Sequence, residues 1–356
     1  MVISAHRLNR SPSQRFRYEQ YIDHLSQNGF EFTFSSLLNA QDDAIFYSEG
    51  NNIAKAFILL NSVLQRRKDL ARLKDFDIIF IQREASFLGN SNFENAAFKS
   101  RAKVIFDFDD SIWLTDTSPG NKKFEWLKDP NKTKTNISNA HLVIAGNIYL
   151  ADYAKQFNKN VVVIPTTVDT ERFFAKPELR NKNRIVIGWS GSISTIKHFE
   201  LLIPALKKLK EKFGDTIAFK VIGDASYINS ELGIKGQAWN ADTEVDDLNA
   251  FDIGVMPLPN GEWAKGKCAL KGLTYMACEI PTVMSNVGVS AEIIQQGING
   301  ALCAAETDWV NNISVLIEDA ELRNTLGKKG RETVEERFSL TANKQKYLDA
   351  FNAILK

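Results

Sequence analysis

The chain has 356 residues and a formal charge of +1, with 44 Lys and Arg against 43 Asp and Glu. This length suggests two domains with a core each, and the near-neutral charge argues against binding of nucleic acid. No apolar run approaches the length of a membrane span, and the start of the chain lacks the apolar segment of a signal peptide. Three cysteines, Cys268, Cys278 and Cys303, show no metal-ligand spacing and are odd in number. This usage predicts a cytoplasmic protein without a disulfide framework or a metal site.

Strands and helices are predicted to alternate along the first half of the chain. Apolar runs predict strands at 1–5, 30–34, 77–82, 103–107, 140–145 and 161–165. Helical periodicity predicts helices at 13–27, over much of 35–74, and at 93–99 and 149–157. Strands and helices that alternate in this way form a parallel sheet covered on both faces.

A second α/β series follows a polar stretch, residues 169–183, which is predicted to be a linker. Strands are expected from 184, at 218–223, 234–239 and 252–258, and from 281. Helices are expected at 199–212, 245–250 and 269–278, and again from 308. The fold class is therefore α/β, with two doubly wound domains at 1–168 and 184–339. Such a pair is expected to hold its ligand in a cleft beyond the carboxyl ends of the strands.

The stretch 252–300 carries the strongest candidate for a binding site. Its loop brings Lys265 and Lys267 to the start of the helix at 269–278, and Lys271 lies one turn further along. A helix N-terminus has unpaired N–H groups and a partial positive charge, which together favour an anion. Two interpretations stay open: a diphosphate site, or an ordinary crossover with solvated lysines.

A second phosphate loop is predicted after the strand that begins at 184. Gly188 is followed by Ser190, Gly191 and Ser192, and Lys197 supplies a positive charge. Glycines and small hydroxyl residues allow backbone to approach a phosphate. The glycine spacing is not that of a dinucleotide fingerprint, so no nicotinamide cofactor is predicted.

Polar residues end several strands of the first domain, at the edge where substrates bind in parallel sheets. They are His6, Arg7, Arg83, Glu84, Asp107, Asp109 and Asp110. The aspartates resemble the first motif of magnesium-dependent haloacid-dehalogenase phosphatases, but three strands precede them here and that family begins with this strand. Orienting the hydroxyl groups of a sugar or acceptor is the preferred role. Local capping and surface ion pairs are the alternatives.

Basic residues gather in two parts of the first domain. One group lies within the first seventeen residues, and the other is formed by Arg66, Arg67, Lys68, Arg72 and Lys74. Contact with anionic lipid headgroups at the cytoplasmic face of a membrane, or with an anionic acceptor, is one interpretation. A solvated helix face is the other.

Taken together, the motifs of the second half resemble family 4 glycosyltransferases, which have the GT-B fold. The resemblance rests on the strand at 252–258, the Lys267–Lys271 helix start, the segment 275–283 and the segment 287–300. Residues 163–173 resemble the interdomain stretch of that family. The first half is similar only at 82–84, 107–110 and 145–147.

The resemblance implies a retaining, metal-independent transfer of a sugar from a UDP or GDP donor, with no other cofactor. The first domain would bind a glycan or lipid-linked acceptor, the second would bind the donor, and residues 340–356 would return to the first. Carried over by position, Asp109 and Asp110 lie near the sugar. The diphosphate would be bound by Ser190, Gly191, Ser192, Lys197, Lys267 and Lys271. Gly266, Cys268, Ala269 and Thr274 fall where donor sugar and ribose are contacted.

The chain departs from the family at two positions. Gly266 and Thr274 stand where the family usually has two glutamates, and Glu262 is a candidate replacement for the first. The predicted function is that of a glycosyltransferase in surface-polysaccharide or glycoconjugate assembly. An inactive GT-B-like scaffold subunit and a nucleotide-sugar epimerase are the alternatives.

Overall fold

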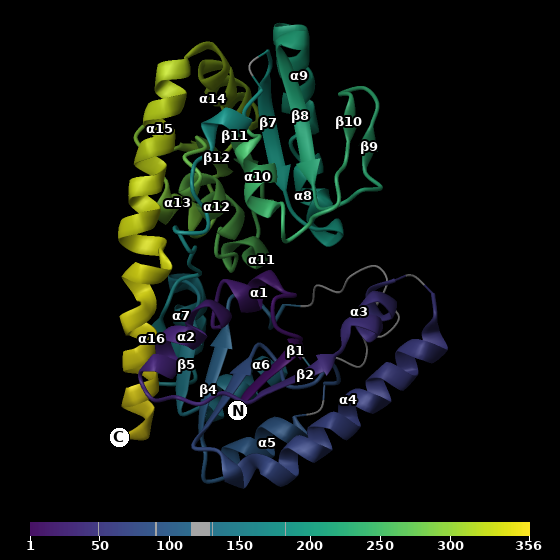
Figure 1. Ribbon diagram of the computed structural model, residues 1–356, viewed down its shortest axis with the longest axis vertical. Helices are drawn as coiled ribbons and strands as arrows, with labels where there is room; N and C mark the ends of the chain where they lie inside the picture. The colour runs from purple at the N-terminus through teal and green to yellow at the C-terminus, as the bar shows by residue number, and fades with distance from the viewer. Residues whose placement is uncertain (49, 90, 115–128, 130, 182) are drawn as a thin grey trace. The chain divides into compact units, whose positions relative to one another are not determined.

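The computed structural model describes residues 1–48, 50–89, 91–114, 129, 131–181 and 183–356 (Figure 1). They form two compact units, each with its own parallel sheet. The first unit comprises residues 1–166, 266–268 and 343–356, and the second comprises 167–265 and 269–342. The sequence places its domain boundaries at 168 and 340. None of the helices in the described part of the chain has the length and apolar character needed to cross a membrane.

The first unit is built on a six-stranded parallel sheet in the order β2-β1-β3-β4-β5-β6. The strands are β1 (Val2–His6), β2 (Phe34–Leu38), β3 (Ile78–Gln82), β4 (Lys103–Phe108), β5 (Leu142–Ala145) and β6 (Val161–Val163). All five residues of β3 are buried, as expected for a central strand covered on both faces. The helices are α1 (Pro12–Arg15), α2 (Ile22–Gln27), α3 (Ala40–Tyr47), α4 (Asn52–Arg72), α5 (Asn92–Lys99), α6 (Asn131–Asn139), α7 (Ile148–Lys155) and most of α16 (Leu340–Leu355).

The second unit is built on a five-stranded parallel sheet in the order β13-β12-β11-β7-β8. The strands are β7 (Ile185–Ser190), β8 (Ile217–Ile222), β11 (Ile253–Met256), β12 (Thr282–Ser285) and β13 (Ala301–Cys303). A small hairpin pairs β9 (Ile228–Asn229) with β10 (Ile234–Lys235). The helices are α8 (Ile196–Glu200), α9 (Ile203–Phe213), α10 (Glu244–Asn249), α11 (Glu262–Lys265), α12 (Leu270–Ala277), α13 (Ser290–Ile293), α14 (Glu306–Glu318) and α15 (Ala320–Thr333).

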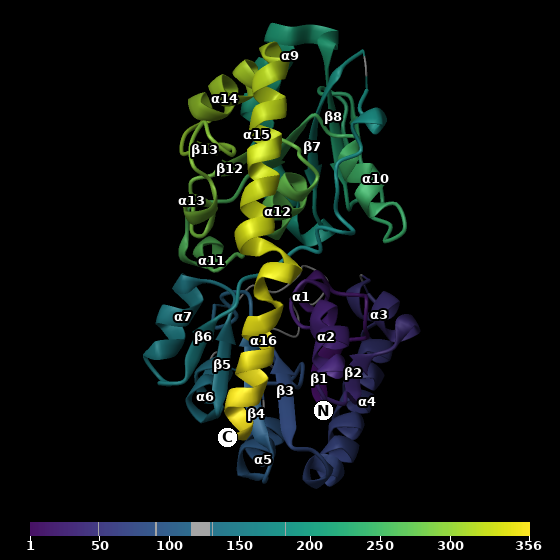
Figure 2. The same ribbon diagram turned by 60° about the vertical axis from the view of Figure 1, so that its left-hand side comes forward.

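Two predictions in the first half are wrong. The strand expected at 30–34 is β2, which begins at Phe34 instead (Figure 2). The rings of Phe30 and Phe32 pack against Phe351 of α16. The helix expected at 13–27 is broken into α1 and α2. The break lets Arg17 enter the interior, where its side chain is fully buried.

Two predictions in the second half are also wrong. The helix expected at 199–212 is two helices, α8 and α9, and Pro204 lies in the first turn of α9, where proline is tolerated. The strand expected at 234–239 is only the two-residue arm β10 of an antiparallel hairpin, followed by a single bridge from Gln237 to Ile222.

Candidate functional site

The topology of each sheet marks one point where a ligand is favoured. In the second unit β8 lies on one side of β7 and β11 on the other, so the direction of winding reverses between β7 and β11. In the first unit it reverses between β1 and β3. Open parallel sheets bind ligands beyond the carboxyl ends of the strands at this reversal. The loops after β7 and β11, and those after β1 and β3, are therefore the candidate sites of the two units.

The loop after β7 is a compact turn closed by glycines and hydroxyl groups. An added Cβ at Gly191 would lie 2.1 Å from the Trp189 ring, and one at Gly223 would lie 2.1 Å from the Gly191 carbonyl oxygen. Only glycine permits these approaches. The Ser192 N–H donates to Thr195 Oγ1 at 2.9 Å, and the Thr195 N–H donates to Ser192 O at 2.8 Å. The loop predicted to bind phosphate is thus a tight, partly exposed backbone turn.

Lys271 and the start of α12 lie beside this turn. The Lys271 Nζ donates to Thr195 Oγ1 at 3.4 Å and lies 4.7 Å from the centre of the Trp189 ring. Ala269 precedes the helix with φ of 55°, a strained value for a residue other than glycine. Its methyl group offers no oxygen to the N–H groups of the first turn. These groups and the lysine therefore form a positive site next to the turn.

The predicted residues Lys197 and Glu262 lie around the one-turn helix α11. The Lys197 Nζ is 5.8 Å from the ring centre of Trp263, which is also 5.4 Å from the His198 ring. The Glu262 side chain is 64% exposed and its carboxylate is 2.5 Å from the Lys265 Nζ. Glu262 is thus a surface carboxylate paired within its own turn of helix.

Thr274 and Tyr275 have their hydroxyl groups committed to the backbone. Thr274 is buried, and its Oγ1 donates to Lys271 O at 2.8 Å. Tyr275 is also buried, and its hydroxyl oxygen accepts the Ser190 N–H at 2.7 Å. Burial raises the pKa of Tyr275 above its ordinary value, so the hydroxyl stays neutral. Sequence reasoning missed Tyr275 as a support of the turn after β7, because nothing in the pattern pairs residues so far apart.

Charged residues of the first unit meet at the carboxyl ends of β3 and β4. The Arg83 Nε donates to Asp109 Oδ1 at 2.7 Å, and its Nη2 lies 3.7 Å from Asp110 Oδ2. The Lys267 Nζ is 2.6 Å from the same Asp110 oxygen. Burial alone would lower the pKa of Arg83, but the charges of Asp109 and Asp110 raise it well above its ordinary value. The structure thus joins predicted acceptor-side and catalytic residues to a lysine predicted to bind phosphate.

Gly266 fits its position only because it lacks a side chain. A Cβ there would lie 2.1 Å from Ser111 Oγ and 2.8 Å from the Ser111 nitrogen. The Asn147 Nδ2 donates to Gly266 O at 3.2 Å and to Lys267 O at 3.3 Å, which fixes this backbone on the first unit. The glutamate usual in the resembling family has no room here.

Cys268 is a neutral thiol. Its Sγ donates to Asp109 O at 3.3 Å, and burial together with the Asp109 charge raises its pKa to about 12. A thiol with this pKa is almost fully protonated at neutral pH, so Cys268 is not an activated nucleophile.

Asp107 is held by a buried ion pair that sequence reasoning missed. The Arg17 Nη2 lies 2.5 Å from Asp107 Oδ1, and both side chains are fully buried. Arg17 also donates to the carbonyl of Ile164. A carboxylate enclosed in this way is unsuited to be the magnesium-bound nucleophile of a phosphatase. Among the residues that the structure describes, no three His, Cys, Asp or Glu side chains are grouped as a metal site.

His6 and Arg7 contact Asp43 of α3. Their nitrogens lie 3.6 Å and 3.2 Å from its carboxylate, and Arg10 pairs with the same group. Burial opposes ionisation of Asp43, but the hydrogen bonds from His6, Arg10 and Arg7 lower its pKa well below the usual range. Glu84 is half-buried, and its N–H donates to Gln82 O at 2.7 Å. Arg7 therefore forms an ion pair and His6 lies beside the same carboxylate, while a role of either residue toward an acceptor stays a prediction.

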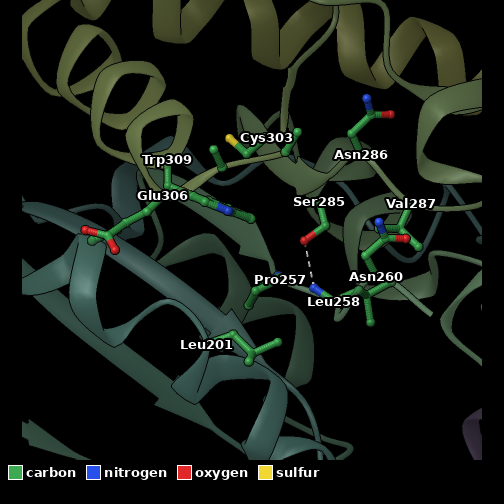
Figure 3. A pocket seen from close by; sticks show the side chains of 13 residues that line it. Leu201, Pro257, Leu258, Asn260, Ser285, Asn286, Val287, Cys303, Glu306 and Trp309 are labelled. Carbon is green, nitrogen blue, oxygen red and sulfur yellow. Dashed lines mark hydrogen bonds between the residues drawn. The ribbon is translucent and has the colours of Figure 1, made fainter.

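A pocket of about 230 Å³ opens at the carboxyl ends of β11, β12 and β13. Asn260, Asn286, Glu306 and Trp309 line it, and the Leu258 N–H donates to Ser285 Oγ at 2.8 Å on its floor (Figure 3). None of the residues predicted to bind the donor lines this pocket.

Residues 184–319 match the family model described as "Glycosyl transferases group 1". This range holds the whole second sheet and the loops after β7 and β11. Residues 184–319 are less than half of the chain, so this match is a similarity of that segment to the family. Gly266 and Thr274 both lie within the matched range, although Gly266 belongs to the first unit.

Two curated proteins are similar to parts of this chain. D-inositol 3-phosphate glycosyltransferase of Stackebrandtia nassauensis is 28% identical over 54% of this chain and 47% of the relative. N-acetyl-alpha-D-glucosaminyl L-malate synthase of Bacillus anthracis is 38% identical over 18% of each chain. These matches span less than half the length of each relative.

Solved structures extend the likeness to the whole chain. HepE of Anabaena, in complex with UDP and glucose, superposes with a TM-score of 0.69 over 99% of both chains at 16% identity. A glycosyltransferase of Rickettsia africae gives 0.68 over 100% of this chain and 98% of the other at 17% identity. The chain therefore has the GT-B fold, as the resemblance implies.

Proposed function

We propose that this protein transfers a sugar from a nucleotide-diphosphate donor, UDP- or GDP-linked, to a glycan or lipid-linked acceptor. The anomeric bond to the diphosphate would break and a bond to an acceptor hydroxyl would form, with retention at the anomeric carbon. Two observations favour a nucleotide sugar: residues 184–319 match the group 1 glycosyltransferase model, and HepE, which shares the fold, has been solved with UDP-glucose.

One observation carries the donor site. The Lys271 ammonium lies 3.4 Å from Thr195 Oγ1, so the start of α12 and the turn after β7 converge where the second sheet reverses direction. A diphosphate that leaves the sugar gains negative charge. The amides at the start of α12 and a lysine would stabilise that charge without a metal ion. Metal independence is part of the proposal.

The polar cluster of the first unit would serve the acceptor. Asp109 and Asp110 are oriented by Arg83, and Lys267 holds Asp110. Carboxylates fixed by ion pairs are suited to accept hydrogen bonds from sugar hydroxyl groups. We propose that Asp110 orients the acceptor hydroxyl, in the assembly of a surface polysaccharide or glycoconjugate.

A non-catalytic scaffold subunit is the second candidate, because two positions disfavour sugar and ribose recognition. Gly266 has no side chain and no room for one, and the Thr274 hydroxyl already donates to a helix carbonyl. A scaffold would keep the fold and lose turnover.

A donor screen separates the candidates. The protein is incubated with UDP- and GDP-sugars, with and without acceptor glycans, and products are detected by mass spectrometry. Release of UDP or GDP from one donor, even by slow hydrolysis, supports the transferase. Binding of a nucleotide sugar without any release, or no binding of any donor, contradicts the transferase and supports the scaffold.

A further inference from the structure

Helix α4 presents a stripe of large apolar side chains to solvent. Ile53 is 78% exposed, Phe57 62%, Leu60 54% and Leu64 44%. Their spacing of four, three and four residues places them on one face of the helix. A contiguous apolar patch of this kind on a globular protein marks an interaction surface.

The opposite face of α4, which packs on the first unit, is largely polar, although Ile58 is buried there in a small apolar cluster with Leu38 and Phe46. Lys55, Ser62, Arg66 and Asp69 are buried there. Arg66 lies 2.8 Å from Asp69 and donates to Ser4 O at 3.0 Å, so the buried charges are paired. Most of the residues that α4 buries are therefore polar or charged, whereas an ordinary surface helix buries an apolar face. Packing within the unit therefore does not account for the apolar stripe.

The stripe continues into positive charge. Arg67 and Lys68 are exposed and follow Leu64 on the same face, and Arg72 and Lys74 extend the basic end. Asp69, the acidic residue of α4, is buried against Arg66. The exposed acids nearest this end, Asp75 and Asp77, lie beyond the helix. α4 lies next to α3 and α5 (Figure 1).

We propose that this face of α4 docks peripherally on an anionic lipid bilayer. Apolar side chains would enter the acyl boundary while Arg67 and Lys68 pair with headgroup phosphates, as in interfacial amphipathic helices. Charge complementarity favours lipid over a second copy of the chain. An antiparallel pair of α4 helices centred on Leu60 would set the basic Arg67 of each copy against the apolar Ile53 of the other.

Co-sedimentation of the full chain with vesicles tests the proposal. Binding is expected with equimolar phosphatidylcholine and phosphatidylglycerol, and much less with phosphatidylcholine alone. Phe57→Ser combined with Leu60→Ser is expected to weaken binding by about tenfold or more, because two apolar anchors are lost. Arg67→Gln with Lys68→Gln is expected to weaken it about fivefold for each charge removed, and added salt acts in the same direction.

Matched controls exclude general effects of exposure and charge. Ile228 and Ile298, 68% and 55% exposed, lie in the second unit, and their double change to Ser is expected to leave binding unchanged. Lys159→Gln with Lys328→Gln controls for net charge. Phe57→Cys carrying an environment-sensitive dye is expected to shift its emission to the blue with anionic vesicles, and Ile298→Cys is not.

Three results would overturn the proposal. The first is that the wild type does not bind anionic vesicles. The second is that the Phe57 and Leu60 variant binds them as well as the wild type does. The third is that the protein does not bind vesicles but forms a dimer in sedimentation velocity, and that the same two changes abolish the dimer; this result would assign the stripe to a second copy of the chain.

Discussion

Gly266 and Thr274 replace the two glutamates common in the resembling family, and the structure gives each replacement a reason. At 266 the Ser111 side chain occupies the space that a Cβ would need. At 274 a short hydroxyl residue bonds to the preceding turn of its own helix. Both positions are closely surrounded, so a glutamate does not fit either of them without a change in its neighbours.

Gly266→Glu is therefore expected to lower the free energy of unfolding by about 1–3 kcal/mol, the scale of overpacking in a well-packed region. Thermal denaturation followed by fluorescence measures the change. Gly261→Glu is the matched control, because nothing lies within 4 Å of a Cβ at Gly261. A gain in donor turnover by Gly266→Glu at unchanged stability would contradict this account of the position.

Lys271 is expected to contribute more to nucleotide binding than Lys267, because the Lys267 ammonium is paired with the Asp110 carboxylate. Lys271→Ala removes the ammonium beside the turn after β7. It should weaken UDP or GDP binding by about 1.5–3 kcal/mol, the strength of a hydrogen bond to a charged group. Calorimetry measures the loss, with Lys328→Ala as the exposed control. Equal affinity of the wild type and Lys271→Ala would place the diphosphate elsewhere.

The reactivity of the three cysteine thiols tests whether they are buried in the folded protein. Burial raises the pKa of Cys268, Cys278 and Cys303 to about 12 each. The neutral thiols favour the folded state below the unfolded pKa of about 8.5, and this stability is lost as pH rises through the folded values. Ellman's reagent at pH 8 is expected to react only slowly with the folded protein. In guanidinium, where the thiols are exposed, it is expected to react readily with all three. Rapid modification of one thiol in the folded state would show an accessible thiolate.

At the scale of elements, the turn after β7 depends on a side chain from α12. Tyr275→Phe keeps the ring but removes the oxygen that accepts the Ser190 N–H at 2.7 Å. Leaving that donor unsatisfied is expected to cost about 1–3 kcal/mol of stability and to weaken nucleotide binding through the loosened turn. Denaturant titration and calorimetry measure the two effects. Tyr153→Phe, in the first unit, is the control, and equal behaviour of both variants would remove Tyr275 from this role.

Sequence reasoning succeeded where the signal is local. The strand at 252–258 and the helix at 269–278 were predictable, because the apolar run ends in prolines and the helix starts after a basic segment, although that segment also holds the short helix α11. It failed where contacts between residues far apart in the sequence determine the local structure. The strand at Phe34 is set four residues later than predicted, because Phe30 and Phe32 pack on α16. Likewise, no local pattern pairs Lys267 with Asp110, which is 157 residues away.

At the scale of the whole molecule, the chain ends in the unit where it began. Residues 343–356 belong to the first unit, and Phe351 is buried there against Phe30 and Phe80. Tyr347 stacks on Tyr21 at 4.2 Å. The end of α16 is therefore part of the first core.

Phe351→Ala is expected to destabilise the first unit by about 3–5 kcal/mol, because it leaves a cavity among aromatic rings. Scanning calorimetry should show a lower melting temperature for the unfolding transition of the first unit, while the melting temperature of the second unit is unchanged. Leu355→Ala on the same helix is the control, since Leu355 is 48% exposed. Equal loss in both variants would mean that α16 acts through its helix and not through the Phe351 ring.

Calorimetric titration of the wild-type protein with UDP and GDP tests the central claim most directly, because the donor site is assigned to the turn after β7 and the start of α12. The expected result is one binding site for one of the two nucleotides, without added metal ion. If neither nucleotide binds, with or without magnesium, the donor site and the proposed transfer are both contradicted.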